Sequence, residues 1–472
     1  MNPGKKPSPG SRVFRPSRAR PVHLALLPQR KARAKTPSFV LVLLGFAALI
    51  IIGTILLMLP AASRSGQITP LGDALFTATS AVCVTGLVVV DTGSYWSGFG
   101  QSVILFLIQI GGFGFMTSAT LFLFILRQRV GLREKILTSQ SLGLDRYGGF
   151  SGLVFRVAVA AVTLELVGAV VLFIRFSAAN PPGLAAWKAV FHAVSAFNNA
   201  GFDIMGGLRS LNQYQQDGWV LLTVAALVIT GGISFVVIED LFSKRRFARL
   251  AMDTKIVLTV TAVLLVAGTL YILISEFSNP STLGNLSLPQ KILSSFFHSA
   301  SSRTAGFSVF DIGSMTLGSL FFTMLLMFIG GAAGSTAGGI KVNSFGLLVF
   351  TAVDSLRGKE FPGVFGRQFL TEQVYRAMTL VMIFIAVIST ITVLLSLTEE
   401  QGLTDLIFES FSALGTVGLS TGITPDLSPL GKIIITIGMF IGRLGPLSLF
   451  SLMVARAQES IRHYPTSLVR LG

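Results

Sequence analysis

The chain has 472 residues, of which 51% are hydrophobic and 12% are charged, and its mean hydropathy is +0.73. A soluble domain normally carries about twice that share of charge, so the composition excludes a soluble globular protein and predicts an integral membrane protein. The net charge of +16 comes from basic residues that lie between apolar runs, which is typical of membrane anchoring and not of nucleic-acid binding. The single Cys83 excludes an internal disulfide.

The N-terminal part of the chain combines a basic tail with a first apolar run. Residues 1–36 hold ten Lys or Arg and no acid, which predicts a disordered tail on the cytoplasmic side. Phe39 to Leu59 contains 21 residues without a charge, long enough to cross a bilayer and too long for the core of a signal peptide. The next apolar segment, Leu71 to Cys83, would be about 20 Å long as a helix and cannot cross a core of about 30 Å. We therefore expect it to enter the membrane and return on the same side.

This short segment recurs three times, each copy with a Phe ten residues before a Gly. The four pairs are Phe76 and Gly86, Phe191 and Gly201, Phe296 and Gly306, and Phe408 and Gly418. Apolar runs flank every copy, and the expected spans are 39–59, 102–126, 152–174, 219–242, 256–275, 315–349, 376–397 and 430–454. The pattern predicts an all-α integral membrane protein built from four consecutive copies of one unit, with eight spans and four re-entrant segments.

The repeats set the expected domain boundaries. After the tail at 1–36, the repeats are predicted at 37–136, 137–250, 251–367 and 368–472, the last of them including a C-terminal tail. Lys and Arg follow the second span of each repeat, whereas most acidic residues of the loops lie on the opposite side. The positive-inside rule therefore predicts that both termini are cytoplasmic.

The four glycines suggest a chemistry for the re-entrant segments. A loop at membrane depth leaves backbone carbonyls unpaired, which is tolerated only where the loop lines water or is buried in protein. Rings of carbonyl oxygens from four such loops can replace the hydration shell of a potassium ion, and glycine tolerates the required backbone angles without adding a side chain. The alternative is that these glycines only end short helices or allow close packing.

Six segments resemble one family in sequence and in order. They are TSAVCVTGL, SAFNNAGFD, SSRTAGF, ALGTVGLSTGIT, GGAAGSTAGGIK and IGRLGPLSLF. They are similar to those of the Trk/Ktr/HKT superfamily of potassium transporters, and because only one span precedes Gly86 the chain is most similar to the KtrB type. The resemblance implies four consecutive helix, pore-helix, filter and helix repeats around a pseudo-fourfold ion pore. The resemblance implies a bacterial potassium-uptake subunit in the cytoplasmic membrane. It would form a homodimer in membrane lipid on a cytoplasmic ring of nucleotide-binding, KtrA-type subunits.

The resemblance also assigns a selectivity filter, with potassium as the substrate, no cofactor in this chain and sodium as a candidate activator. The four filter segments share no side-chain type, which favours coordination by the backbone. Their residues are Val84, Thr85, Gly86, Asn199, Ala200, Gly201, Thr304, Ala305, Gly306, Thr416, Val417 and Gly418. In the plant branch a Ser at the first filter glycine accompanies sodium preference, so Gly86 favours potassium.

The last predicted element is a gate within the third repeat. Residues 330–339 read GGAAGSTAGG, and five glycines at about 1 kcal/mol each should unwind a helix there. We expect this segment to lie as a loop across the pore below the filter, and the resemblance implies that Arg443 is a positive barrier there. The alternatives are close helix packing for the segment and a pair between Arg443 and Glu409. The predicted gate residues are Gly330, Gly331, Gly334, Ser335, Thr336, Gly338, Gly339, Lys341 and Arg443.

Several polar residues near the glycines lead to further predictions. Arg303 should point away from a cation path and brace its loop, while Lys341 should lie where a pore charge or a partner can move the gate. Acids follow three of the glycines and are expected at the outer mouth. His192 and His298 lie nine and eight residues before their glycines, which predicts unmatched polar residues behind the filter and not metal ligands. The three acids are Asp91, Asp203 and Asp311.

Other functions are less compatible with these residues. A membrane enzyme would need a nucleophile, a metal set or paired carboxylates at membrane depth, and the spans offer almost none. A carrier of organic anions would direct positive helix ends to its substrate, whereas the short helices here direct negative ends to the glycines. A sodium-permeable or weakly selective cation transporter of the same fold remains an alternative.

Overall fold

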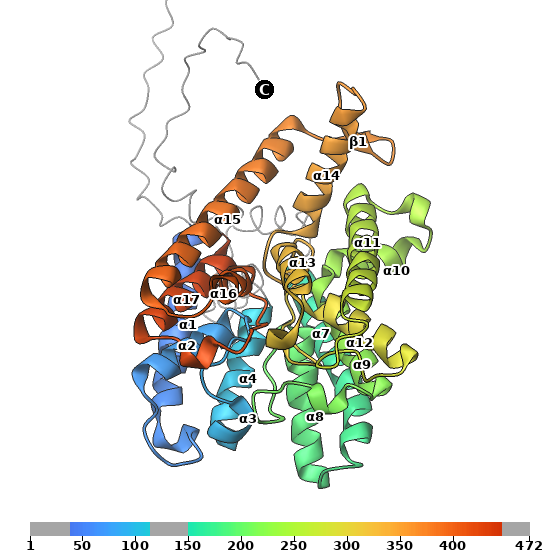
Figure 1. Cartoon of the computed structure of the whole chain (residues 1–472). Helices are drawn as coiled ribbons and strands as arrows, with labels where there is room; N and C mark the ends of the chain where they lie inside the picture. The colour runs from blue at the N-terminus through green and yellow to red at the C-terminus, as the bar shows by residue number, and fades with distance from the viewer. Residues whose placement is uncertain (1–37, 114–149, 446–472) are drawn as a thin grey trace, which may run out of the picture. The chain divides into compact units, whose positions relative to one another are not determined.

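The computed structural model describes residues 38–113 and 150–445 of the chain. The predicted basic tail, the far ends of the spans at 102–126 and 430–454, and the C-terminal tail lie outside the described residues. Within the described part nearly all regular structure is helical (Figure 1). The one departure from the predicted all-α class there is a hairpin of two short strands, β1 (Gly363–Val364) and β2 (Arg367–Gln368).

The helices fall into four units, each with a first helix, a short helix and a return helix in this order. The first helices are α1 (Ser38–Met58), α7 (Phe150–Phe176), α11 (Met252–Ser275) and α15 (Thr371–Thr398). The short helices are α2 (Leu71–Val82), α8 (Pro182–Phe197), α12 (Leu288–Ser301) and α16 (Leu403–Gly415). The return helices are α4 (Gly98–Gly112), α9 (Gly218–Gly232), α13 (Leu317–Phe328) and α17 (Pro429–Leu444).

Within residues 38–113 and 150–445, two return helices are followed by a second helix. Helix α10 (Phe235–Lys244) comes after α9 at an angle of 95°. Helix α14 (Val342–Leu356) comes after α13, from which the non-helical residues 329–341 separate it (Figure 1). The remaining regular elements are α3 (Thr92–Tyr95) and short 3-10 turns.

The return helices are too short to cross a bilayer alone. They contain 12 to 16 residues, which is about 18 to 24 Å against a core of about 30 Å. Among the described residues three helices are long and apolar enough to span, namely Arg156–Phe176, Met252–Ser275 and Thr371–Thr398, or four if the bent pair α9 and α10 counts as one. The expected span at 219–242 is interrupted at residues 233–234 by a bend of 95°, which the sequence pattern did not predict. The expected span at 315–349 is interrupted at residues 329–341, in agreement with the predicted loss of helix at 330–339.

A glycine position explains where the return helices end. Each return helix has a side-chain N-cap, and 14 residues later comes a Gly followed by Gly or, in unit 4, by Arg443. Glycine weakens a helix by about 1 kcal/mol, and a pair of them is a common site of a sharp kink. The capping residues are Ser97, Asp217, Thr316 and Ser428, and the first glycines are Gly111, Gly231, Gly330 and Gly442.

Loop acids tie the first helices to these caps. The Glu276 carboxylate, after α11, accepts a hydrogen bond from the Thr316 amide at 2.9 Å, and Glu399, after α15, accepts one from the Ser428 amide at 2.9 Å. In unit 2 an ion pair between Arg175 and Asp217, 2.7 Å long, has the same role. Acidic loop residues, which the sequence analysis used only to assign the sides of the membrane, therefore connect the ends of the first helices to the starts of the return helices.

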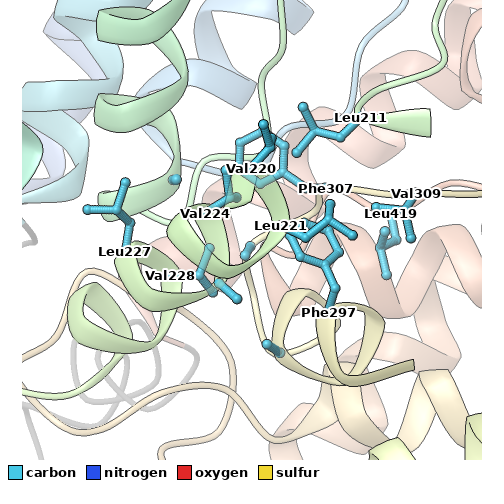
Figure 2. Packing of buried hydrophobic residues seen from close by; sticks show 14 of the residues in the cluster. Leu211, Val220, Leu221, Val224, Leu227, Val228, Phe297, Phe307, Val309 and Leu419 are labelled. Carbon is cyan, nitrogen blue, oxygen red and sulfur yellow. The ribbon is translucent and has the colours of Figure 1, made fainter. Parts of the chain in front are cut away.

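The four units close into a circle. The return helix of each unit packs against the short helix of the next, as α4 with α8, α9 with α12, α13 with α16, and α17 with α2. Figure 2 shows the second of these contacts, where Val224 and Val228 of α9 lie near Phe297 of α12. A salt bridge of 3.1 Å between Lys432 and Asp73 joins unit 4 to unit 1.

Unit 3 departs from the predicted spacing by one residue. Phe76, Phe191 and Phe408 are fully buried, but in unit 3 the buried ring is Phe297 and not the predicted Phe296. The segment between this ring and Gly306 is therefore one residue shorter than in the other units. His192 and His298 each directly follow the buried Phe, so the prediction that they are unmatched is wrong.

Candidate functional site

The predicted filter segments share an unusual backbone conformation. Two residues before each glycine the chain has a positive φ, at Val84 (+55°), Asn199 (+57°), Thr304 (+76°) and Thr416 (+49°). The four glycines also have positive φ, between +69° and +93°. A left-handed residue other than glycine is uncommon, above all a β-branched one. Its occurrence at one offset in four units, on Val, Asn and Thr alike, shows that the fold imposes this conformation.

Hydrogen bonding divides the two sides of these segments. Ten of the twelve amides donate back toward their own short helix; for example, Thr85 N donates to the Ser80 carbonyl at 2.8 Å and Val417 N to the Ser412 carbonyl at 2.9 Å. The carbonyl oxygens of the same three residues in each segment accept no hydrogen bond from any residue that the structure describes. Each segment thus presents free acceptors, which require a partner that this part of the chain does not supply.

One serine at the end of each short helix braces the segment, a role the sequence analysis missed. The hydroxyls of Ser80 and Ser412 accept from the amides of Gly86 and Gly418, at 3.1 Å each. In units 2 and 3 the serine donates to the carbonyl after the glycine, from Ser195 to Phe202 at 2.7 Å and from Ser301 to Phe307 at 2.6 Å. A Ser six residues before the Gly in three units, and five before it in unit 3, was the available signal.

The four glycines meet in a closed ring. A methyl group added at Gly201 would lie 2.7 Å from the Ala305 carbonyl oxygen and 3.0 Å from the Gly306 Cα atom. Methyl groups on the other glycines would meet the next segment in the same way, and the last of them returns to unit 1. The facing pairs are Gly86 with Ala200, Gly201 with Ala305, Gly306 with Val417, and Gly418 with Thr85. Glycine is thus required because any side chain would strike the neighbouring backbone.

A hollow of about 450 Å³ opens on one side of this ring. All four glycines line it, together with the three predicted acids and Arg209. Each acid also caps a loop: Asp91 accepts from the Gly207 amide at 2.8 Å and Asp203 from the Met205 amide at 3.0 Å. Burial, with a smaller contribution from the charge of Asp91, raises the pKa of Asp203 to about 6.

The predicted gate segment is a closed loop between α13 and α14. Its base is fixed by a hydrogen bond of 2.9 Å from the Gly330 amide to the Ile340 carbonyl. Its tip is held at Thr336, whose hydroxyl donates to the Gly231 carbonyl at 2.9 Å and to the Phe197 carbonyl at 3.3 Å. Those carbonyls belong to the ends of α9 and α8 in unit 2. Gly338 lies against the Thr416 side chain, so the loop also contacts the glycine ring from unit 4.

The cations of the predicted gate bind carbonyl groups. Arg443 Nη1 donates to the Thr336 carbonyl at 2.6 Å and Nη2 donates to the Gly111 carbonyl, which connects unit 4 to the loop and to unit 1. Lys341 Nζ donates to the Ala337 carbonyl at 2.6 Å. Glu409, the alternative partner of Arg443, instead accepts from Ser420 and Thr424 and forms no ion pair with Arg443. The loop is therefore held by two cations on adjacent carbonyls.

The remaining predicted residues lie behind the segments. Arg303 is 8% exposed and directs Nη2 to the Gly330 carbonyl and to Thr261, at 3.4 and 3.5 Å, so it faces back into the protein as expected. His192 Nδ1 lies 2.7 Å from the Lys188 carbonyl, and His298 Nε2 lies 3.0 Å from the Thr323 hydroxyl. Both imidazoles are buried in the packing around the short helices.

One polar cluster was missed altogether. Glu165 of α7, Gln109 of α4 and Asn198 at the end of α8 hydrogen bond to one another, and Glu165 is only 6% exposed. The signal was present, because Glu165 is the only acid in the predicted span at 152–174. An ionisable residue within an apolar span is a functional candidate by default.

Comparison with known proteins identifies the family. A family model described as TrkH, cation transport protein, matches residues 22–464. The chain belongs to this family. It is 42% identical to Ktr system potassium uptake protein B of Bacillus subtilis over 93% of this chain and 97% of that protein. It is 39% identical to the potassium/sodium uptake protein NtpJ of Enterococcus hirae, over 94% of this chain and 99% of that protein.

A solved structure agrees at the level of the fold. The potassium transporter TrkH from Vibrio parahaemolyticus superposes with a TM-score of 0.71 at 19% identity, covering 92% of this chain and 87% of that one. The predicted resemblance to the Trk/Ktr superfamily, KtrB type, is thereby confirmed. The relatives are transporters and not enzymes, in agreement with the prediction. Family membership and the apolar helices together make this chain a membrane protein.

Proposed function

We propose that this chain conducts potassium into a bacterial cell and that the glycine ring is its selectivity filter. The observation that carries the proposal is the set of free carbonyl oxygens, three in each of four segments, whose amides are mostly used by the short helices. Unpaired carbonyls at membrane depth need a partner, and rings of them can replace the hydration shell of potassium. Several relatives named as potassium uptake proteins support the choice of ion.

The short helices add electrostatic attraction for a cation. Each ends directly before a filter segment, so the negative end of its dipole adjoins the ring. The filter side chains do not compete for the ion; the Asn199 amide, for example, lies 3.0 Å from the Val228 carbonyl, behind the segment. Uptake then needs no chemistry beyond dehydration, because the membrane potential supplies about 2.3 kcal/mol per charge at 100 mV.

The loop at 329–341 is the proposed gate. It crosses from unit 3 to contacts with units 2 and 4, and through Arg443 with unit 1, next to the ring. A loop held by hydrogen bonds to Thr336 and Ala337 can open when these bonds break, without any change in the filter.

We also propose that this chain forms a homodimer on a cytoplasmic, nucleotide-binding ring of KtrA type and that both of its termini are cytoplasmic. The name Ktr system, which two of the relatives carry, supports a system of more than one component. Weakly selective or sodium-permeable transport is the second candidate, favoured by the potassium/sodium uptake protein among the relatives.

Uptake of rubidium by a bacterium that lacks its own potassium transporters tests the proposal. Cells that express this chain, with and without a KtrA-type subunit, should accumulate rubidium and grow at low potassium, and excess potassium should compete better than sodium. Equal competition by both ions would favour the second candidate. Membrane-inserted protein without rubidium or sodium uptake in either arm would refute transport of these ions.

A further inference from the structure

A buried polar cluster behind the second filter segment has no role in the mechanism above. The Glu165 carboxylate accepts from Gln109 Nε2 at 3.1 and 3.2 Å and from Asn198 Nδ2 at 3.0 Å. Asn198 Nδ2 also donates to Gln109 Oε1 at 3.0 Å. The three side chains come from three helices, two in unit 2 and one in unit 1. They therefore link the units directly beside the filter.

The other three units provide an internal comparison for Glu165. In unit 2 Gly168 of the first helix packs on Leu227 of the return helix, which lies four residues before the glycine pair that begins at Gly231. The equivalent contacts are Gly53 with Leu107 in unit 1 and Gly268 with Leu326 in unit 3. In unit 4 the sizes are exchanged, so that Ile391 packs on Gly438. Three residues before these anchors on the first helices, where unit 2 has Glu165, the other units have apolar residues: Ile50, Leu265 and Ile388.

The same comparison holds for Gln109, which lies two residues before the glycine doublet of α4. The counterparts in the other return helices are Ile229, Phe328 and Phe440, all apolar. The packing between first and return helices at this position thus needs no polar group, because three of the four units have apolar residues there. A carboxyl group buried in a membrane helix is costly, so its presence at one interface points to function.

We propose that Glu165 is a positioning residue that sets the selectivity of the second filter segment through Asn198. Asn198 caps the C-terminal end of α8 and is followed at once by Asn199, whose φ of +57° begins the filter segment. Without the carboxylate the amide nitrogen of Asn198 keeps two neutral acceptors, Gln109 Oε1 at 3.0 Å and the Val194 carbonyl at 2.9 Å, and loses the one that can carry a charge. The link from the segment to its first helix is then lost, and a ring of four carbonyls discriminates between ions only while its width is held.

The proposal rests on the proposed function, since it assumes that the ring selects potassium. It explains why only unit 2 has this cluster: the braces differ between units. Arg303 stands three residues before its glycine in unit 3, as Asn198 does in unit 2, and bonds to the Gly330 carbonyl and to the Thr261 hydroxyl of α11, at 3.4 and 3.5 Å. Cys83 and Gly415 occupy this position in units 1 and 4 and have no such amide. Among the four segments, segment 2 is therefore the one that a carboxyl group of its own first helix braces.

The test measures the ratio of potassium to sodium competition against rubidium uptake. Glu165→Gln replaces one acceptor oxygen by a donor that faces the Gln109 donor, and Glu165→Leu copies the counterpart Leu265. Both variants should lower the ratio about fivefold, which corresponds to loss of a net hydrogen bond of typical strength. The double variant Glu165→Gln with Gln109→Glu keeps one carboxylate and one amide with exchanged places and should recover the ratio to within about twofold.

Controls separate this proposal from the proposed function and from misfolding. Leu265→Ile, at the counterpart in unit 3, should leave the ratio unchanged. Rubidium uptake by the wild-type chain tests the proposed function alone. If the wild type takes up rubidium with potassium preference, and inserted Glu165→Gln keeps the wild-type ratio, the proposal is refuted. If Glu165→Leu does not insert, Gln109→Leu tests the same brace from unit 1, and a wild-type ratio in that variant also refutes it.

Discussion

The four units are alike in the glycine ring and unlike in the adjacent layer, by which we mean the ends of the return helices and the residues that follow them. In the ring, segments with unrelated side chains adopt one backbone conformation, with positive φ at Val84, Asn199, Thr304 and Thr416. In the adjacent layer the four return helices share the same glycine position but continue differently. Helix α9 turns by 95° into α10, α13 leads into the loop at 329–341, and in unit 4 Arg443 replaces the second glycine.

The difference shows what each layer requires. Selection by a carbonyl ring depends on equal geometry around the ion, and this can be achieved by the backbone while side chains diverge. If the adjacent layer contains the gate, as we propose, one element there must move relative to the others, which would account for the loss of equivalence among the units. On the proposed function, changes in the ring should alter which ion passes, and changes in the adjacent layer should alter how much passes.

The largest effect is expected from Gly86→Ser in the ring. The hydroxymethyl group would strike the Ala200 carbonyl, and φ is +92° at this residue, which only glycine adopts without strain. We expect the preference for potassium over sodium to fall by about tenfold or more, since strain of about 1–3 kcal/mol must be relieved by moving the ring. Competition in rubidium uptake measures it.

Gly72→Ser is the matched control for this change, because no atom lies within 4 Å of a methyl group added at Gly72 in the same unit. Gly201→Ser and Gly418→Ser should act as Gly86→Ser does. A wild-type ion preference in all three ring variants would mean that the ring does not select ions.

A smaller effect, on flux and not on preference, is expected from deletion of Ala332 to Ala337. The deletion joins Gly331 to Gly338, and the ends are close because a methyl group at Gly330 would lie 2.8 Å from the Gly338 carbonyl carbon. Loss of Thr336 removes the tip of the loop while the filter stays. Rubidium uptake should rise several-fold and lose control by the regulatory subunit, and an inserted deletion variant with ordinary regulated uptake would contradict a gating role for the loop.

The sequence was sufficient for the parts of the fold that depend on local chemistry. The short helices and the glycines could be placed from a recurring pattern, and the glycine-rich run at 330–339 indicated loss of helix by its composition. The break in α9 could not be predicted, because one glycine pair weakens an apolar run of 24 residues by only about 2 kcal/mol. The glycine pair determines where the helix ends only because Gly231 packs directly against the Phe197 carbonyl, a contact that the sequence does not reveal.

Two errors came from properties of single residues. Phe296 and Phe297 are adjacent and chemically identical, so spacing alone could not tell which is buried, and the choice of Phe296 concealed the match between His192 and His298. Glu165 could be noticed in its span, but its partners lie 56 and 33 residues away and depend on how the units pack.

An effect of intermediate size on flux is expected from substitution of Arg443, which can act either as a tether of the loop or as an electrostatic barrier to the ion. Arg443→Gln removes the charge and weakens the bonds to Thr336 and Gly111 and should raise flux about threefold to fivefold, as expected for loss of about one net hydrogen bond. Arg443→Lys keeps the charge but cannot hold two carbonyls with a planar fork. If Arg443 acts as a tether of the loop, the Lys variant should resemble the Gln variant.

An electrostatic barrier predicts the opposite outcome, namely wild-type flux in Arg443→Lys and raised flux only in Arg443→Gln. Dependence of rubidium uptake on the regulatory subunit, measured in the same cells, adds a second readout, because a tether but not a barrier couples the loop to regulation. Wild-type flux and regulation in both inserted variants would make Arg443 structural.

The smallest effect concerns the acids of the hollow beside the ring, which test whether the ring receives its ions from a negatively charged mouth. Burial and the charge of Asp91 raise the pKa of Asp203 to about 6, so Asp203 is ionised at pH 7 and becomes neutral as the pH falls through 6. The neutral form attracts cations less, and uptake at low rubidium should therefore fall by about twofold between pH 7 and pH 5. Asp203→Asn should show the lower uptake at pH 7 and no further fall, whereas Asp311→Asn, which removes another acid of the same hollow, should retain the fall because Asp203 still titrates. If Asp203→Asn keeps the full pH dependence, the titrating group lies elsewhere and the hollow does not concentrate ions through Asp203.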